Sequence, residues 1–147
     1  MKKNNKQHNL ERGQSMVELA LTITILMILL AGVIDMGRAF FTYMAMRDAA
    51  QEGAAYGAVN PFDEAGTKVR VWDNLDQVVP DPDHPEDDID ISIKYSGPRC
   101  LGYEIVVNVN YEQFPLTMPF LGWILNSQTI PIHATINDTI LRPTCGE

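Results

Sequence analysis

The sequence predicts an α+β protein in which a long N-terminal helix, first apolar and then amphipathic, precedes a small antiparallel sheet domain. Two observations support this prediction. An uncharged block, LALTITILMILLAGVI, runs from Leu19 to Ile34, and apolar residues alternate with other residues in three stretches after residue 88. We therefore divide the chain into a basic leader (1–13), a transmembrane span with its amphipathic continuation (14–58) and an extracytoplasmic α+β domain (59–147).

The apolar block is long enough to cross a bilayer once. With Met16, Val17 and Glu18 it makes nineteen residues, which is about 28 Å of helix against roughly 30 Å of hydrocarbon. The leader holds four basic residues and one acidic residue, so the positive-inside rule places the N-terminus in the cytoplasm and the domain outside. A cleaved secretory signal is the alternative. It should have an uncharged core and a small-residue cleavage site, whereas Glu18 opens this block and no Ala-x-Ala follows it.

Helical spacing continues beyond the span. Small or apolar residues recur at alternating intervals of three and four, which is typical of a packed helix face. This seam comprises Met36, Ala39, Tyr43, Met46, Ala50, Gly53 and Gly57. Four other residues fall off it: Arg38, Thr42, Asp48 and Glu52. We expect one helix from about Gln14 to Ala58, about 67 Å long, whose seam packs either on the protein's own domain or against a partner helix.

The most specific motif lies where the leader meets the span. Gly13 is followed by Gln14 and, five residues after the glycine, by Glu18. A carboxylate at the edge of hydrocarbon is costly unless it is paired, so Glu18 is a functional candidate. Cleavage after Gly13 would expose an α-amine on Gln14 that can pair with Glu18 in the same or a neighbouring chain. The alternative is that Glu18 lies solvated at the cytoplasmic interface and is inert.

This arrangement resembles type IV prepilins and pseudopilins, and residues 12–58 resemble the N-terminal region of TadE-like proteins. The matching features are Arg12-Gly13, Val17-Glu18-Leu19-Ala20-Leu21, Asp35-x-Gly37-Arg38 and Ala49-Ala50-x-Glu52-Gly53-Ala54. The resemblance implies a pilin-like, non-catalytic minor pseudopilin that assists assembly or secretion of a tight-adherence (Flp, type IVc) pilus by helix packing. It implies a place in the bacterial inner membrane or the pilus. It also implies three partners: an assembly platform, other pseudopilins and a prepilin peptidase acting between Gly13 and Gln14.

The pattern after residue 58 predicts one helix and three strands. Asn60 as N-cap, Pro61 at the first helical position and Asp63 at the third predict a helix, which the apolar spacing carries to Val79. Alternation predicts strands over 89–95, 103–111 and 130–136, arranged as an antiparallel meander on the helices. The apolar stretch 114–125 is too short and too interrupted by proline to span a bilayer. It either caps the sheet or forms an exposed docking or membrane-surface patch.

The remaining candidate sites lie in the domain. Cys100 precedes the second strand and Cys145 follows the third, so an antiparallel pair places both at one edge of the sheet, where an oxidising compartment favours a disulfide. Two free thiols are the alternative. His133 lies among strand residues, which indicates a sheet-face histidine. The acidic segment 81–90 either binds calcium or is a solvated charge run.

Composition and motifs restrict the function classes. The net charge of −8 argues against nucleic-acid binding. The sequence has no phosphate loop, nucleophile elbow or HExxH motif, so we expect no enzyme activity, no cofactor and no metal site. The alternative to a pilus component is a membrane-tethered extracytoplasmic binding module that recognises calcium or a surface.

Overall fold

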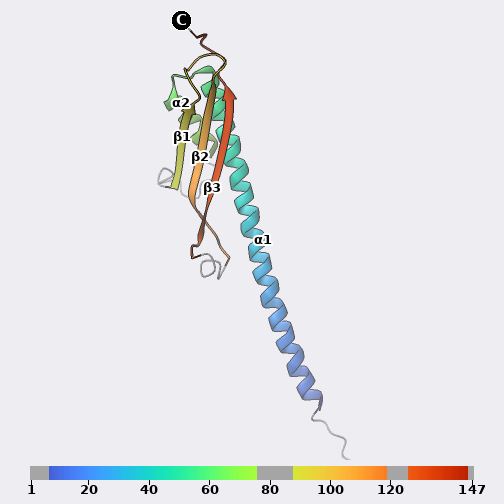
Figure 1. Cartoon of the computed structure of the whole chain (residues 1–147). Coiled ribbons are helices and arrows are strands. Elements are labelled where there is room, and N and C mark those ends of the chain that lie inside the picture. The colour runs from blue at the N-terminus through green and yellow to red at the C-terminus, as the bar shows by residue number, and fades with distance from the viewer. Residues whose placement is uncertain (1–6, 76–87, 119–125, 146–147) are drawn as a thin grey trace, which may run out of the picture.

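The computed structural model describes residues 7–75, 88–118 and 126–145. Its elements are α1 (Gln7–Val59), α2 (Glu64–Leu75), β1 (Ile89–Tyr95), β2 (Glu104–Pro115) and β3 (Thr129–Thr139). Figure 1 shows α1 as one long rod whose second half lies along the sheet and whose first half extends away from it. A long apolar helix followed by a three-stranded antiparallel sheet confirms the predicted α+β class.

Helix α1 begins earlier than the sequence pattern indicates. It starts at Gln7 instead of about Gln14 and continues through Gly13 without a break. Residues 7–13 contain no proline, and one glycine inside a helix costs only about 1 kcal/mol relative to alanine, so nothing stops the helix at the leader boundary. The helix ends at Val59, because Pro61 disfavours helical conformation at the preceding residue.

The sheet is a meander with strand order β1-β2-β3, and both pairs are antiparallel. Its inward rows follow the predicted alternation: Ile91 lies opposite Val109, which lies opposite Ala134. All three side chains are buried. The three predicted strands are therefore confirmed, with their phases correct.

The second strand is longer than predicted because a bulge resets its phase. Pairing shifts between Tyr111 and Phe114, so that two residues of β2 face Pro131 alone on β3. Proline has no N–H to give to a ladder, which makes this a favourable place for the irregularity. Tyr111 and Phe114 are both buried as a result, with their rings edge to face and 5.9 Å apart. The bulge thus brings the end of β2 onto α1.

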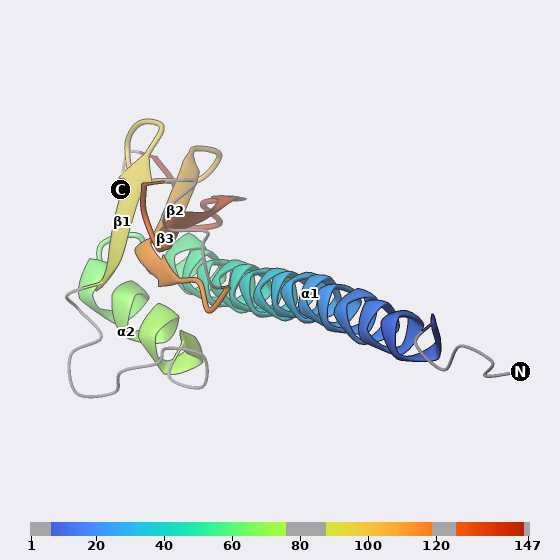
Figure 2. The same cartoon turned by 90° about the horizontal axis from the view of Figure 1, so that it is seen from below.

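The core lies between one face of the sheet and the two helices. Figure 2 shows α1 and α2 on the same side of the three strands, and side chains of all five elements form one buried cluster. Two glycines of α1 permit this close approach: a Cβ at Gly53 would overlap the Val71 side chain, and one at Gly57 would overlap Ile105. The opposite face of the sheet is polar, with His133 Nδ1 3.1 Å from the side-chain oxygen of Asn110. This confirms His133 as a sheet-face residue.

The start of α2 differs from the prediction. Asn60 is not its N-cap; residues 60–63 form a turn in which the Asp63 N–H donates to the Asn60 carbonyl at 3.0 Å. Asp63 caps the helix instead, because its Oδ1 accepts the Gly66 N–H at 2.9 Å. Its Oδ2 accepts the Tyr56 hydroxyl at 2.8 Å. The described part of α2 ends at Leu75, and the predicted continuation to Val79 lies outside the described residues.

The disulfide closes the end of the sheet that is distant from the apolar half of α1. Cys100 and Cys145 are bonded, with their Cα atoms 5.1 Å apart and a sequence separation of 45. The Leu141 N–H donates to the Ala58 carbonyl at 2.8 Å, which joins the C-terminal segment to the end of α1. The predicted pairing of the two cysteines is therefore present.

Candidate functional site

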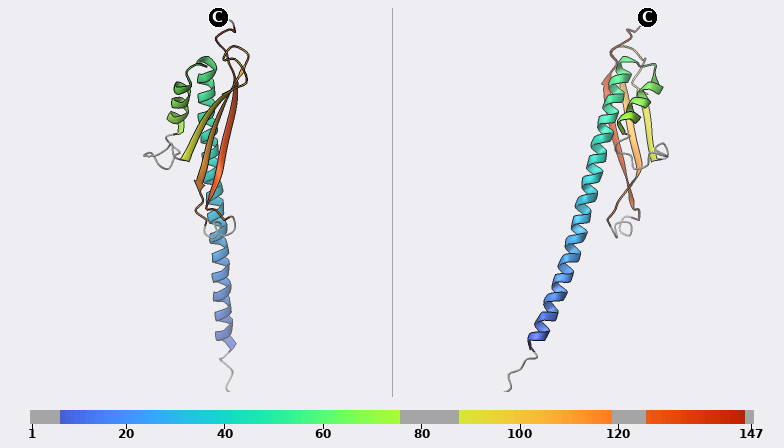
Figure 3. Two further views of the ribbon diagram at one scale, coloured as in Figure 1. Left: turned by 60° about the vertical axis from the view of Figure 1, so that its left-hand side comes forward. Right: turned by 180° about the vertical axis from the view of Figure 1, so that it is seen from behind.

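The apolar half of α1 is largely free of protein packing, except at its last turn, where Gly32 lies beside Met118. Within the described residues, α1 is the helix that is long and apolar enough to cross a membrane, and its most apolar window has none of its residues buried. Two views in Figure 3 show this half projecting free of the sheet and of α2. Thr22 and Thr24 donate their hydroxyls to the carbonyls four residues earlier, each at 2.8 Å. These polar side chains are thereby satisfied within the helix, as an apolar surrounding requires.

The predicted processing and pairing residues lie on the exposed surface of this half. Gly13, Gln14 and Glu18 are all exposed and all belong to the uninterrupted helix. A Cβ at Gly13 would meet nothing within 4 Å. The position therefore tolerates side chains as far as this chain's own packing is concerned.

The most organised polar contact is one that the sequence did not reveal. Asp35 is only 4 % exposed, and its carboxylate accepts the backbone N–H groups of Thr117 at 3.0 Å and Met118 at 2.6 Å. These two residues follow β2, so the contact binds the start of the β2–β3 connection to α1. We call Asp35, Arg38, Thr117 and Met118 the Asp35 site.

Arg38 completes the Asp35 site from the next turn of α1. Its guanidinium lies 3.6 Å from the Asp35 carboxylate and donates to the Thr117 hydroxyl at 2.6 Å. It also lies 5.4 Å from the centre of the Phe114 ring, a cation–π distance. The negative charge of Asp35 is therefore paired within the site, and the guanidinium remains 43 % exposed.

The seam on α1 packs on the protein's own domain, and Ala39 lies against the core as predicted, but the prediction is wrong for two residues of its first half. Met46, Ala50, Gly53 and Gly57 are buried as predicted. Met36 is 77 % exposed and Tyr43 39 % exposed, so neither belongs to the contact face. Two polar residues take their places: Asp35 and Thr42 are buried there. Spacing rules select apolar residues, and here the contact face includes Asp35, whose carboxylate accepts N–H groups of the connection after β2.

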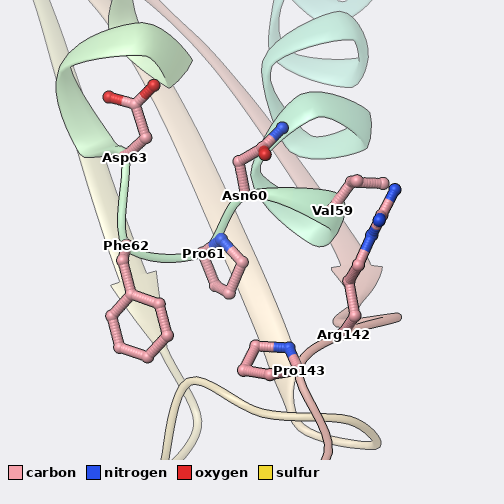
Figure 4. Close-up of a pocket in the computed structure, with 7 residues that line it drawn as sticks. All are labelled: Val59, Asn60, Pro61, Phe62, Asp63, Arg142 and Pro143. Carbon is pink, nitrogen blue, oxygen red and sulfur yellow. The ribbon is translucent and has the colours of Figure 1, made fainter.

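Two hollows lie at opposite ends of the domain. One of about 290 Å³ adjoins the Asp35 site and is lined largely by apolar residues, including Gly32, Leu116 and Met118. The other, of about 270 Å³, lies where α1 turns into α2 beside the C-terminal segment. Figure 4 shows the Asp63 carboxylate and the Arg142 guanidinium on opposite sides of this hollow. Neither arrangement brings together a nucleophile and a base, and no group of three metal-ligating side chains occurs among the described residues.

Two predicted sites fall partly or wholly outside the described residues. The acidic segment 81–90 is described only from residue 88 onward. The two alternatives predicted for it, a calcium site or a solvated charge run, therefore lie mostly outside the described residues. Of the apolar stretch 114–125, residues 114–118 are described. Phe114 is buried in the core, and the N–H groups of Thr117 and Met118 donate to Asp35, so the described part is held against the sheet and α1.

Comparison with known families identifies the helix. The family model described as TadE-like protein matches residues 13–55. Residues 13–55 are thus similar to TadE-like proteins. The match confirms the resemblance of this segment to TadE-like proteins. It ends within α1, so the sheet domain lies outside the matched TadE-like segment. No curated protein and no solved structure matches the chain.

The segment similar to TadE-like proteins contains the exposed apolar helix and also the residues that α1 contributes to the Asp35 site. Its first part is the exposed apolar helix with Glu18, and its second part carries Asp35, Arg38 and the seam glycines. In the Asp35-x-Gly37-Arg38 motif, the two charged residues are therefore explained by their contacts with the domain. Gly37, whose Cβ would meet nothing within 4 Å, has no such contact.

Proposed function

We propose that this protein is a minor pseudopilin of a tight-adherence pilus system and that it assists pilus assembly or secretion by helix packing, without catalysis. The observation that supports this proposal is the division of α1. One face of its second half is buried against the protein's own domain, whereas its first half exposes an apolar surface that the domain leaves uncovered except at its last turn. A helix of this kind has its free surface in the membrane, where its neighbours are lipid or other helices.

We further propose that the protein lies in the bacterial inner membrane, with its N-terminus in the cytoplasm and its sheet domain outside. The basic residues of the leader and the positive-inside rule support this orientation. The disulfide supports it as well, because disulfides persist in oxidising compartments. A reporter enzyme that requires export should be active when fused after residue 147. Activity of a cytoplasm-dependent reporter at the same place would overturn the orientation.

Glu18 is the proposed point of contact with other subunits. After cleavage by a prepilin peptidase between Gly13 and Gln14, the new α-amine carries a positive charge near the apolar surface. A carboxylate from the same or a neighbouring subunit stabilises that charge, and Glu18 is the first acidic residue after the cut. The assembly platform and other pseudopilins are the proposed partners of the exposed helix.

The deciding experiment replaces the wild-type gene with variants in the organism that encodes it. Glu18→Gln removes the charge at nearly constant shape, and we expect it to reduce the amount of pilus recovered from the cell surface. Glu52→Gln is the matched control, since Glu52 is an exposed carboxylate of the same helix beyond the span. Pili are quantified by electron microscopy and by immunoblotting of the sheared fraction. Normal pili with Glu18→Gln, together with native protein that keeps its leader, would reduce the protein to a membrane-anchored domain.

A further inference from the structure

We propose that the start of the β2–β3 connection, residues 116–118, lies within the edge of the membrane, in contact with the acyl chains of the leaflet on the domain's side. The domain would then touch the bilayer directly and not only through α1. This inference rests on the membrane-spanning role of α1 proposed above. It concerns a segment that the span itself does not include.

The level of Met118 along α1 is set by its contacts. A Cβ at Gly32 would lie 3.6 Å from the Met118 sulfur. The backbone N–H of Met118 donates to the carboxylate of Asp35, which lies three residues after Gly32 in α1. Gly32 belongs to the uncharged block of residues 19–34. Met118 therefore lies beside the last turn of the apolar block.

The length of the block places that turn inside the hydrocarbon. Residues 16–34 supply about 28 Å of helix, and the hydrocarbon core is roughly 30 Å thick. Glu11 and Arg12 flank the block on the leader side, so the span cannot move far in that direction. Counted as about 20 residues of helix from Gly13 or from Met16, the hydrocarbon on the domain side therefore ends between Gly32 and Asp35, which is the level of Met118. Any tilt of the helix moves this edge further toward the domain.

The Asp35 site has the chemistry that such a location requires. Irregular backbone at membrane depth is tolerated only where its polar groups are satisfied by protein. The N–H groups of Thr117 and Met118 both donate to the Asp35 carboxylate. Arg38 balances the charge of that carboxylate and is partly exposed one turn nearer the domain, where a long basic side chain reaches the headgroup region.

The side of α1 that the domain does not cover independently indicates where the hydrocarbon ends along the helix. Met36 is 77 % exposed, and Phe40 and Phe41 are 64 % and 68 % exposed. These apolar side chains continue the surface of the span by about two turns on faces that the domain leaves open. Lipid is the occupant that this surface fits, because the exposed apolar residues are continuous with the membrane-spanning block.

The test measures the depth of an environment-sensitive fluorophore, NBD, attached at Met118→Cys in the full chain with its disulfide intact. The protein is reconstituted in phosphatidylcholine vesicles that contain a lipid with a doxyl quencher near its headgroup. We expect a blue-shifted emission, strong quenching by the doxyl lipid and a loss of quenching by aqueous iodide. Leu116→Cys, which borders the same hollow, is a second reporting position in case the first variant does not fold.

Two control positions separate this inference from the proposed function. Ile25→Cys lies at the middle of the span, and its NBD should be protected from aqueous iodide; if it is not, the membrane-spanning proposal itself fails. Val69→Cys is an exposed apolar position on α2 and should be quenched by iodide. If Ile25 behaves as expected but Met118 and Leu116 behave like Val69, the inference is wrong. Protection at Met118 that disappears when the protein is diluted into excess lipid would also overturn it, since a second copy would then be the cover.

Discussion

The carboxylate of Asp35 accepts the backbone N–H of Met118 at 2.6 Å, although 83 positions separate the two residues in the chain. With the Thr117 N–H at 3.0 Å, this contact fixes the connection after β2 to the point where α1 leaves its apolar block. The sheet is thus attached to α1 near both ends of their common length. The disulfide and the Leu141–Ala58 hydrogen bond close the opposite end.

Removing the Asp35 carboxylate should destabilise the domain. Asp35→Ala leaves two backbone N–H groups without their acceptor, which costs about 1–3 kcal/mol, and Asp35→Asn should cost less because one acceptor oxygen remains. The measurement is urea unfolding in detergent micelles, followed by tryptophan fluorescence. Asp48→Asn removes an exposed carboxylate from the same helix and should leave the unfolding midpoint unchanged. Equal midpoints for Asp35→Ala and Asp48→Asn would contradict the structural role of the Asp35 site.

Glycines of α1 differ in whether the structure leaves room for an alanine methyl group. Gly57→Ala places a Cβ where the Ile105 side chain already lies, so we expect destabilisation of about 1–3 kcal/mol despite the better helix propensity of alanine. Gly37→Ala meets nothing within 4 Å and should be neutral or stabilising by up to about 1 kcal/mol. The unfolding midpoints of both variants decide the matter. A stabilised Gly57→Ala would show that α1 does not pack closely on β2.

The disulfide should contribute several kcal/mol to the stability of the domain. Cys100 and Cys145 have a sequence separation of 45, for which loop-closure entropy predicts about 4 kcal/mol. We expect Cys100→Ser to lower the melting temperature and the double variant with Cys145→Ser to melt at the same temperature as the single one. Non-reducing peptide mapping of the wild-type protein should recover the two cysteine peptides linked. Full alkylation without reductant, in protein freshly isolated from its native envelope, would remove this prediction.

Acid should weaken the cap of α2. The Gly66 N–H lowers the pKa of the Asp63 carboxyl below its usual value, and the Tyr56 hydroxyl lowers that pKa further. A carboxyl whose pKa is lower in the folded state stabilises that state above its unfolded pKa and loses this contribution as pH falls through the folded value. The melting temperature of the wild type should therefore exceed that of Asp63→Asn at pH 7, and the two should converge in acid. Asp73→Asn, on the same helix, controls for the loss of a negative charge and should run parallel to the wild type.

Processing is testable by mass alone. If a peptidase cuts after Gly13, the intact mass of protein from native membranes corresponds to a chain that starts at Gln14. Gly13→Leu should block this cut and leave membrane insertion intact, because the apolar block is unchanged. A wild-type mass that includes Met1 would show that the leader is retained.

The strands and the disulfide were predictable because their signals are local. Strict alternation through Ile89, Ile91 and Ile93 fixes which face of β1 is inward. Once β2 and β3 are antiparallel neighbours, the edge shared by Cys100 and Cys145 follows. The extension of β2 was not predictable from alternation, since the bulge between Tyr111 and Phe114 changes the phase.

The Asp35 site could not be derived from spacing. A buried aspartate is recognisable only together with its partners, and these are backbone N–H groups, which any sequence supplies. For the same reason the seam was assigned to Met36 and Tyr43, which are exposed, in place of Asp35 and Thr42, which are buried. The N-cap was misplaced because Asn60 and Asp63 are both good capping residues. Only the turn between α1 and α2 decides that Asp63 meets the Gly66 N–H.

Because α1 is one continuous helix, it fixes the rotational orientation of the sheet domain relative to the apolar half of the helix. One helix of 53 residues joins the apolar block to the sheet, and each residue advances the helix by about 100° and 1.5 Å. Deleting one residue within the apolar block would therefore rotate the sheet by about 100° around the helix axis, relative to the part of α1 before the deletion. It would also shift the sheet by about 1.5 Å along that axis. The direction in which the sheet faces around the helix axis is therefore set by the number of residues in α1.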